Sequence, residues 1–401
     1  MPESISFLLG AGFSAPMGYP IGNELNEALL NCTVKDFCFS SDGRLCIPEK
    51  GREPGYRTHF DLEFEFCLDL IQFYRTRTNY FDYEEFYDFF MGKANQDPDV
   101  EALYKKKNYG TERDVRQMLS AMRTIYSQLI AHFLVDNEGN SWYDDAPHYG
   151  GPIFPGYTGL LNCLRDLSND YLLNVHTLNH DLFFERLRIT DWLLGKICDG
   201  FQELESPYYG KLLVNGRSYR CRLEYYSGLY DKQIRLYKLH GSKDYGIYYT
   251  ANGPSSLRPE GYIKTRYGIG FGEFYKEIND EKGKPSYERC WANYHADFLT
   301  GTTSKIERYS EPLLFKVLFE CFVTNLKNAE KLIIIGYGAK DAEVNRMILE
   351  NFDFKKKPVF IVDPYVGNAV KGLQAQLNAT LITKHLKEIT LDDFKAPKKD
   401  R

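Results

Sequence analysis

The chain has 401 residues, of which 43% are hydrophobic and 26% charged, a composition typical of a globular protein large enough for two or three domains' worth of core. The formal net charge of −5 argues against binding to nucleic acid or to an anionic membrane through overall basicity, so no direct nucleic-acid binding is expected. No apolar run approaches the roughly 20 residues of a membrane-spanning helix, and no membrane association is predicted.

The cysteines and histidines give no pattern typical of a metal site. The nine cysteines are scattered and none has C-x-x-C spacing, which predicts reduced thiols in a cytoplasmic protein. A first strand close to Met1 leaves no room for a cleavable signal peptide. His176 and His180 have H-x-x-x-H spacing but straddle a predicted strand end, so no metal is expected. The abundant tyrosines and phenylalanines favour aromatic packing and a homo-oligomer.

The first chemically informative stretch follows an apolar run over residues 5–9. Gly10-Ala11-Gly12-Phe13-Ser14 predicts a buried strand that turns tightly into a helix, with the amides of residues 11–13 and Ser14 facing a phosphate. The same pattern fits a plain strand-to-helix connection. No acidic residue ends a second strand about 20 residues further on, which argues against an ordinary dehydrogenase.

The next part of the chain is predicted to be mainly helical. Residues 23–30 have the spacing of a first helix, 33–57 look irregular, and 62–90 and 115–135 have helical periodicity with strong apolar stripes. We therefore expect a mainly helical insertion over residues 58–150.

An α/β pattern then resumes. A helix is expected over 157–167 and a strand over 171–176, followed by Thr177-Leu178-Asn179-His180-Asp181 and a helical stretch over 182–189. A second strand, over 234–239, precedes His240-Gly241-Ser242. Residues 250–300 are rich in glycine and proline and are expected to form a small loop-rich lid.

The last third of the chain continues the alternation. Ser310-Glu311-Pro312 has the cap, acid and proline of a helix start, for a helix reaching about residue 328. A strand over 331–335 ends in Gly336-Tyr337-Gly338, with Asp341 before a helix over 342–349. A strand over 359–362 ends at Asp363, and 367–377 and 380–383 predict a last helix and strand before a basic tail over 395–401. The expected fold is one α/β domain over 1–401 with a Rossmann-like, doubly wound, mostly parallel sheet.

The polar residues after these strands have side chains suited to chemistry. An amide such as that of Asn179 both donates and accepts hydrogen bonds without charge, and a histidine such as His240, with an ordinary pKa near 6.5, suits general-base work. Asp181 could orient a ligand or the loop, and Asp363 could accept from a ribose hydroxyl. Structural alternatives stay open: Asn179, Asp181 and Asp341 could cap helices, and His240 could be a satisfied core histidine.

Taken together and in order, the segments at Gly10, Thr177, Leu239 and Gly336 resemble the sirtuin-like fold, in particular the divergent NAD-cleaving enzymes of bacterial antiphage defence. The resemblance implies that Gly10, Ala11, Gly12, Phe13 and Ser14 hold the NAD pyrophosphate. It also implies that Asn179 and His240 are catalytic, and that Gly336, Tyr337 and Asp341 line the adenosine side. Asp181 and Asp363 are assigned to the same ligand.

Departures from the family pattern decide between activities. Protein-deacylating sirtuins carry paired C-x-x-C motifs for zinc, and this chain has none; Leu178 replaces their glutamine before the catalytic asparagine. The expected function is therefore NAD+ hydrolysis to nicotinamide and ADP-ribose, with NAD as substrate, depleting NAD in antiphage defence. The implied partners are further copies of the chain and a HerA-type ATPase. The alternatives are a non-catalytic NAD or ADP-ribose sensor and an NAD-dependent protein deacylase.

Overall fold

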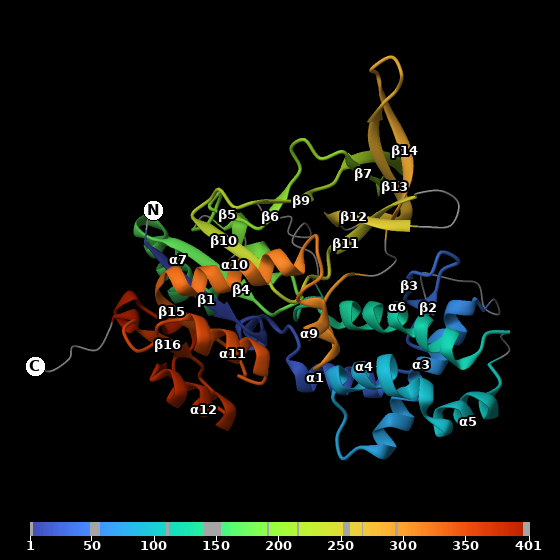
Figure 1. Ribbon diagram of the computed structural model, residues 1–401, viewed down its shortest axis with the longest axis horizontal. Helices are drawn as coiled ribbons and strands as arrows, with labels where there is room; N and C mark the ends of the chain where they lie inside the picture. Colours follow the sequence, from blue (N-terminus) through green and yellow to red (C-terminus); the bar gives the residue numbers. More distant parts are fainter. Residues whose placement is uncertain are drawn as a thin grey trace, which may run out of the picture.

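A seven-stranded parallel sheet forms one end of the molecule (Figure 1). The structure, a computed structural model, describes residues 3–48, 57–109, 112–139, 154–190, 192–214, 216–251, 257–266, 268–292 and 296–395. The sheet has the order β17-β16-β15-β1-β4-β10-β5, and every neighbouring pair is parallel. Its strands are β1 (Ser4–Leu9), β4 (Leu172–Thr177), β5 (Ile197–Cys198), β10 (Ile234–Lys238), β15 (Ala329–Ile335), β16 (Val359–Val362) and β17 (Thr380–Ile382).

The strand order confirms the predicted doubly wound α/β fold. From β1 the chain adds β4 and β10 on one side and later β15, β16 and β17 on the other, so the order reverses between β1 and β15. Helices cover both faces, which explains why all six residues of β1, the two serines included, are buried.

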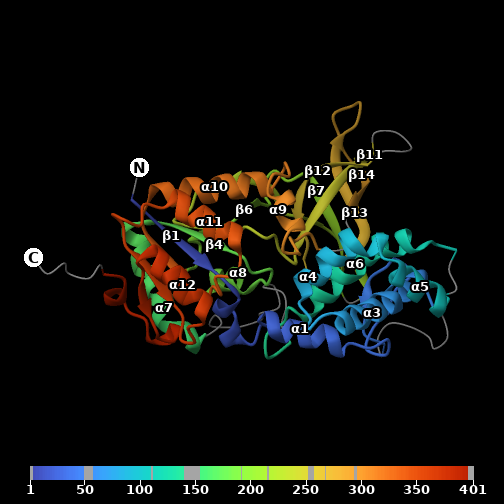
Figure 2. The same cartoon turned by 60° about the horizontal axis from the view of Figure 1, so that its bottom comes forward.

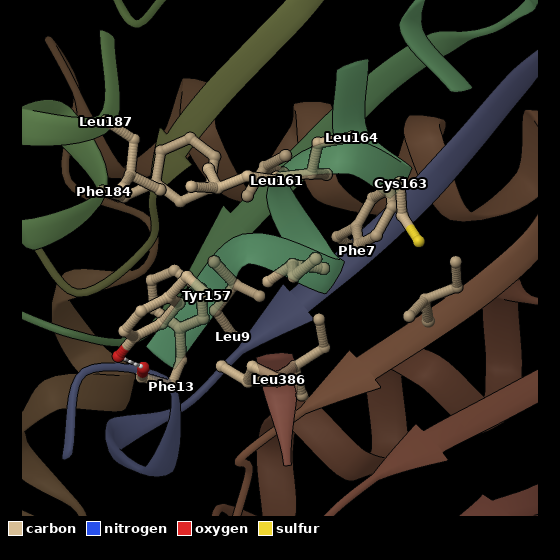
Figure 3. Packing of buried hydrophobic residues seen from close by; sticks show 14 of the residues in the cluster. Phe7, Leu9, Phe13, Tyr157, Leu161, Cys163, Leu164, Phe184, Leu187 and Leu386 are labelled. Atoms are coloured by element: carbon tan, nitrogen blue, oxygen red, sulfur yellow. Dashed lines mark hydrogen bonds between the residues drawn. The ribbon is translucent and has the colours of Figure 1, made fainter. Parts of the chain in front are cut away.

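The alternating side chains of β1 divide the hydrophobic core into two layers. Phe7 and Leu9 pack with α7 (Thr158–Asp170) and α8 (Phe183–Arg186), whereas Leu8 packs on the opposite face. Figure 3 shows the first layer, including Phe13 against Tyr157, whose hydroxyl donates to the Phe13 carbonyl at 2.5 Å. The opposite face is covered by α10 (Phe315–Asn328), α11 (Ala342–Asn351) and α12 (Asn368–Leu377).

The elements from α1 to α6 form a helical unit with a hydrophobic core of its own, at the other end of the molecule from the parallel sheet (Figure 2). Side chains of Thr58, Asp82, Asp97 and Asp114 accept from first-turn amides, so local capping explains where its helices begin. The elements are α1 (Gly22–Asn31), β2 (Cys38–Phe39), β3 (Leu45–Cys46), α3 (His59–Arg77), α4 (Tyr83–Asp88), α5 (Pro98–Lys107) and α6 (Val115–Phe133), with a π-helical turn at Phe89–Lys93. Of the predicted insertion over 58–150, residues 110–111 and 140–150 lie outside the described chain.

A second, antiparallel sheet with the order β6-β9-β12-β11-β14-β13-β7-β8 lies beside the helical unit (Figure 1). The expectation that 250–300 is loop-rich is wrong, because three strands of this sheet lie there. Many of their polar side chains are exposed, as at Glu288 and Arg289, so the apolar alternation that marks a strand is weak. The strands are β6 (Gly200–Gln202), β7 (Tyr208–Val214), β8 (Arg217–Arg222), β9 (Tyr225–Leu229), β11 (Tyr245–Ala251), β12 (Leu257–Lys264), β13 (Ile269–Asn279) and β14 (Pro285–Ala292).

The helix predicted to open at Pro312 begins later, at Phe315. Leu313 has a φ of 79°, a left-handed conformation that does not belong to a helix, so the chain turns once more before α10. The short helix α9 (Ser304–Arg308) precedes this turn. No helix in the described chain has the length and apolar character required to cross a membrane. Residues 396–401 of the predicted basic tail lie outside the described residues.

Candidate functional site

The residues singled out in the sequence gather at one edge of the parallel sheet. Gly10, Asn179, His240, Gly336 and Asp363 follow the carboxyl ends of β1, β4, β10, β15 and β16, which are consecutive neighbours in the sheet. In open α/β sheets, ligands bind outside this edge, at the point where the strand order reverses. Here that point lies between the turns after β1 and β15.

Those two turns touch through their backbones. The Gly12 amide donates to the Gly336 carbonyl at 2.9 Å, and the Gly10 amide donates to the Ile335 carbonyl at 3.0 Å. A Cβ atom on Gly10 would lie 2.7 Å from a backbone atom of Gly336, and a Cβ atom on Gly12 would lie 2.9 Å from one. Gly336 itself has a φ of 59°, a left-handed conformation. Glycine is therefore required at these positions by the contact between the turns, whatever the site binds.

The turn after β1 leads into short 3-10 helical turns, and the first α-helix, expected over residues 23–30, follows further along the chain. Two single 3-10 turns follow, at Ala11–Phe13 and Ala15–Met17, and α1 starts only at Gly22, because Gly18 adopts a φ of 88°. The amides of Gly12 and Phe13 already donate to carbonyls of the protein. The residue Ala11 is exposed, and its amide makes no hydrogen bond to the described residues, so it is the donor that this turn leaves for a ligand.

Asn179 connects β4 to the turn at Gly10–Ser14, called the glycine turn below. Its Nδ2 donates to the Gly10 carbonyl and to the Ser14 hydroxyl, both at 3.0 Å, and its side chain is buried. Since both hydrogens of the amide are used, Oδ1 is the atom with which Asn179 can accept a hydrogen bond from a ligand or a water. The hydroxyl of Ser14 is in turn a hydrogen-bond partner of Asp181.

Asp181 has a structural role in this arrangement. Its carboxylate accepts from the Phe183 amide at 2.9 Å, before the helix α8. Burial raises the pKa of this carboxyl, and the nearby Lys238 ammonium opposes the rise. Lys238 is itself buried, donates to the Asp181 carbonyl and pairs with Glu185 at 2.9 Å. This hydrogen bond holds the turn just before α8, whose N-cap residue is Leu182, and the assignment of Asp181 to the ligand stays a prediction.

His240 is a buried imidazole with few polar neighbours. Its Nε2 lies 3.3 Å from the Tyr309 hydroxyl and 3.6 Å from Asp341 Oδ2, and 4% of the residue is exposed. Burial lowers the pKa of His240 well below its ordinary value; the Lys305 charge lowers it further, and the Asp341 carboxylate acts in the opposite direction. The imidazole is therefore uncharged near neutral pH and can accept a proton.

Asp341 connects His240 to residues that the sequence did not single out. Its Oδ1 caps α11 through the Val344 amide at 3.0 Å, while its Oδ2 lies 3.0 Å from the Lys305 ammonium. Lys305 also pairs with Glu84 at 3.2 Å. These partners are far apart in the chain, and no local motif marks Lys305 or Glu84.

Tyr337 and Asp363 make contacts within their own turns. The Tyr337 hydroxyl donates to the Asp341 carbonyl and to Asn345 Oδ1, which fixes the start of α11. Asp363 accepts from the Tyr365 amide at 2.8 Å, two residues further along the same turn. Their assignment to the adenosine side of a ligand rests on the sequence resemblance alone.

The sheet edge is covered. Gly241 forms a β-bridge with Phe298, whose ring stacks on His180 at 4.6 Å, and α9 brings Lys305 and Tyr309 against the edge. Two cavities, of about 220 and 310 Å³, lie instead on the antiparallel sheet and between that sheet and α6. Neither of these two cavities is lined by His240 or Asn179. His240 is buried against Leu299 and Tyr309, so we expect the segment at 296–309 to move when a ligand reaches the imidazole. No group of three or more His, Cys, Asp or Glu side chains suited to a metal occurs in the described part of the chain.

Comparison with known proteins gives structural matches alone. No family model matches the sequence, and no curated protein matches it. Solved structures that align with 96% of this chain include a Sir2 homolog–NAD complex (11% identity, 86% of that chain, TM-score 0.36) and a structure described as "Structural Basis for the Mechanism and Regulation of Sir2 Enzymes" (11%, 89%, 0.33). Sir2Tm bound to a propionylated peptide aligns at 10% identity over 90% of that chain, with a TM-score of 0.31. At these identities and scores we conclude nothing about activity from them.

Proposed function

We propose that this chain is an enzyme that hydrolyses NAD+ at the nicotinamide–ribose bond, giving nicotinamide and ADP-ribose. The observation that supports this most is that two features lie at the same carboxyl edge of a doubly wound sheet. One is an uncharged, buried imidazole, and the other is the glycine turn, which the side-chain amide of Asn179 holds in place. His240 supplies the base and Asn179 supplies an uncharged acceptor next to the turn. The crevice between β1 and β15 is where such sheets bind dinucleotides.

In the proposed reaction, the Ala11 amide contributes to holding the pyrophosphate, and Oδ1 of Asn179 orients the attacking water or a ribose hydroxyl. His240 takes a proton from the water as the water oxygen bonds to C1′ of the ribose. The C1′–N bond breaks, and its electron pair leaves with neutral nicotinamide. The Asp341 carboxylate, 3.6 Å from the imidazole, stabilises the imidazolium that forms, and solvent later takes the proton.

The wider role rests on the resemblance of the four strand-end motifs. It supports the proposal that the enzyme acts in the cytoplasm, depletes NAD during phage infection, and is regulated by self-assembly and by a HerA-type ATPase.

The test is NAD+ consumption by the purified chain, alone and with a HerA-type ATPase encoded beside it, followed by chromatography of nicotinamide and ADP-ribose. We expect His240→Ala and Asn179→Ala to lower the rate at least about 100-fold, since general-base catalysis alone contributes 10² to 10⁴. His385→Ala and Asn31→Ala, at exposed positions, are matched controls that should keep the wild-type rate. Equal rates in all four variants would contradict the catalytic assignments.

The second candidate is a sensor that binds NAD or ADP-ribose without cleaving it. The covered sheet edge and the internal use of the Gly12 and Phe13 amides favour it. Calorimetric binding of NAD with no product after prolonged incubation, under every activating condition, would establish the sensor and reject the hydrolase.

A further inference from the structure

Lys305 is a buried cation held between carboxylates from two distant parts of the chain. It lies in α9 and is 5% exposed. Its ammonium lies 3.0 Å from Asp341 Oδ2, in the turn after β15, and 3.2 Å from Glu84 Oε2, in α4 of the helical unit. A lysine is buried to this degree only when its charge is compensated, and both carboxylates do so here.

The Asp341 carboxylate is shared between Lys305 and His240. Its Oδ1 is fixed by the Val344 amide at the start of α11, so its Oδ2 stays directed at both the ammonium and the imidazole Nε2. An unpaired carboxylate at this place would favour the protonated imidazolium. With Lys305 on the same oxygen, the negative charge is balanced, and the imidazole keeps a nitrogen lone pair.

We propose that Lys305, held by Glu84, is the positioning residue that pairs with Asp341 and thereby keeps His240 an uncharged base. The inference rests on the proposed NAD+ hydrolysis for its catalytic meaning but not for its structural content. The other titratable groups facing His240 are His180, with ring centroids 6.3 Å apart, and the Tyr309 hydroxyl. Neither carries a charge that could replace that of Lys305 near neutral pH, since burial lowers the pKa of His180 to about 3 and raises that of Tyr309.

The helical unit contacts the segment that carries Lys305 at a second point, Asp88. Asp88, four residues after Glu84 and thus on the same side of α4, accepts from the amides and hydroxyls of Thr302, Thr303 and Ser304 at 2.5 to 3.1 Å. Movement of α4 would therefore carry Lys305 with it and change the charge balance at Asp341. The helical unit therefore fixes the segment that carries Lys305 at two points, Glu84 and Asp88.

The test that needs no activity is the titration of His240 by NMR in the protein without ligand, with side-chain-labelled histidine and His240→Gln to assign the signal. The wild-type imidazole should titrate well below the ordinary histidine pKa, because burial and the Lys305 charge disfavour the imidazolium. In Lys305→Met the titration midpoint should rise by about one pH unit or more, and Lys305→Arg should restore the wild-type curve. If Lys305→Met alone fails to fold, the double variant Glu84→Gln/Lys305→Met replaces it, because it leaves no unpaired carboxylate at Glu84. The double variant should show the same rise of the titration midpoint.

Lys264→Met is the matched control. Lys264 is equally buried and pairs with Asp199 on the antiparallel sheet, so its loss should leave the His240 titration unchanged. An unchanged titration in folded Lys305→Met, or an equal rise in Lys264→Met, would overturn the proposal.

The pH profile of kcat separates positioning from plain structural damage. Relative to its own alkaline plateau, Lys305→Met should lose about tenfold one pH unit below its raised His240 midpoint, a pH at which the wild type keeps its rate, because a protonated His240 cannot act as the base. A loss that is equal at every pH would overturn the positioning role. If the wild-type chain consumes no NAD+, the proposed function fails, while the His240 titration still decides the role of Lys305.

Discussion

Gly12 and Gly336 lie where the turns after β1 and β15 touch, at the reversal of the strand order. The Gly12 amide donates to the Gly336 carbonyl, and a Cβ on Gly12 would meet backbone atoms of residue 336 at 2.9 Å, which cannot rotate away as a side chain would. At the residue scale, the dinucleotide-like glycine pattern is therefore first a packing requirement. Any contribution to ligand binding comes through the exposed Ala11 amide beside it.

We predict that Gly12→Ala destabilises the fold by about 1–3 kcal/mol, the usual cost of forcing extra volume into a packed region. Gly372→Ala is its control, because Gly372 lies inside α12 with nothing within 4 Å of a new Cβ, so alanine should be neutral or stabilising there. Urea unfolding followed by circular dichroism measures both. Equal stability of the two variants would show that the turns can separate freely.

At the element scale, α4 and the segment at 302–304 are joined by one carboxylate. Burial acts to raise the pKa of Asp88, but the hydrogen bonds from Ser304, Thr302 and Thr303 outweigh it and hold the pKa at about 2. Since the pKa in the folded protein lies below the unfolded value of about 3.9, this stabilisation is present above about pH 4 and is lost as the pH falls toward 2.

We expect Asp88→Asn to lower the free energy of unfolding by about 1–2 kcal/mol at pH 7, after allowance for the partial solvent exposure of this half-buried group. The difference from wild type should shrink as the pH falls from about 4 to 2, because the wild-type carboxylate is then protonated too. Thermal unfolding across this range measures it. Asp99→Asn, at an exposed position of α5, should change little, and a pH-independent deficit in Asp88→Asn would contradict the assignment.

The elements differ in how far local sequence determines them. The strands β4, β10 and β16 are almost entirely buried, and their predictions came within one or two residues of the structure. The exposed β8 has no such signal, since its strand conformation depends on pairing with β7. Asn179, His240 and Asp341 could be found because each follows a strand. Lys305 and Glu84 could not, because only the folded chain brings them together.

At the scale of the whole molecule, the helical unit is anchored to the sheet edge on both sides of His240. The Lys243 ammonium, three residues after His240, donates to the carbonyls of Ala131 and Leu134 at the end of α6, where a cation is also favoured by the helix dipole. On the other side, Glu84 and Asp88 hold α9. Figures 1 and 2 place α9 between the helical unit and the parallel sheet. Access to the edge is therefore coupled to the position of the helical unit.

We predict that a bound dinucleotide displaces the 296–309 segment, because His240 is buried against it through the Leu299 amide and the Tyr309 hydroxyl. Hydrogen exchange of the non-cleaving His240→Ala variant, with and without saturating NAD+, measures this. The amides of Thr302, Thr303 and Ser304, which donate to Asp88, should exchange faster with NAD+, while those of the β7–β8 hairpin serve as an unaffected reference. Unchanged or slower exchange at residues 302–304 would mean that the ligand reaches the sheet edge without opening the contact between α4 and α9.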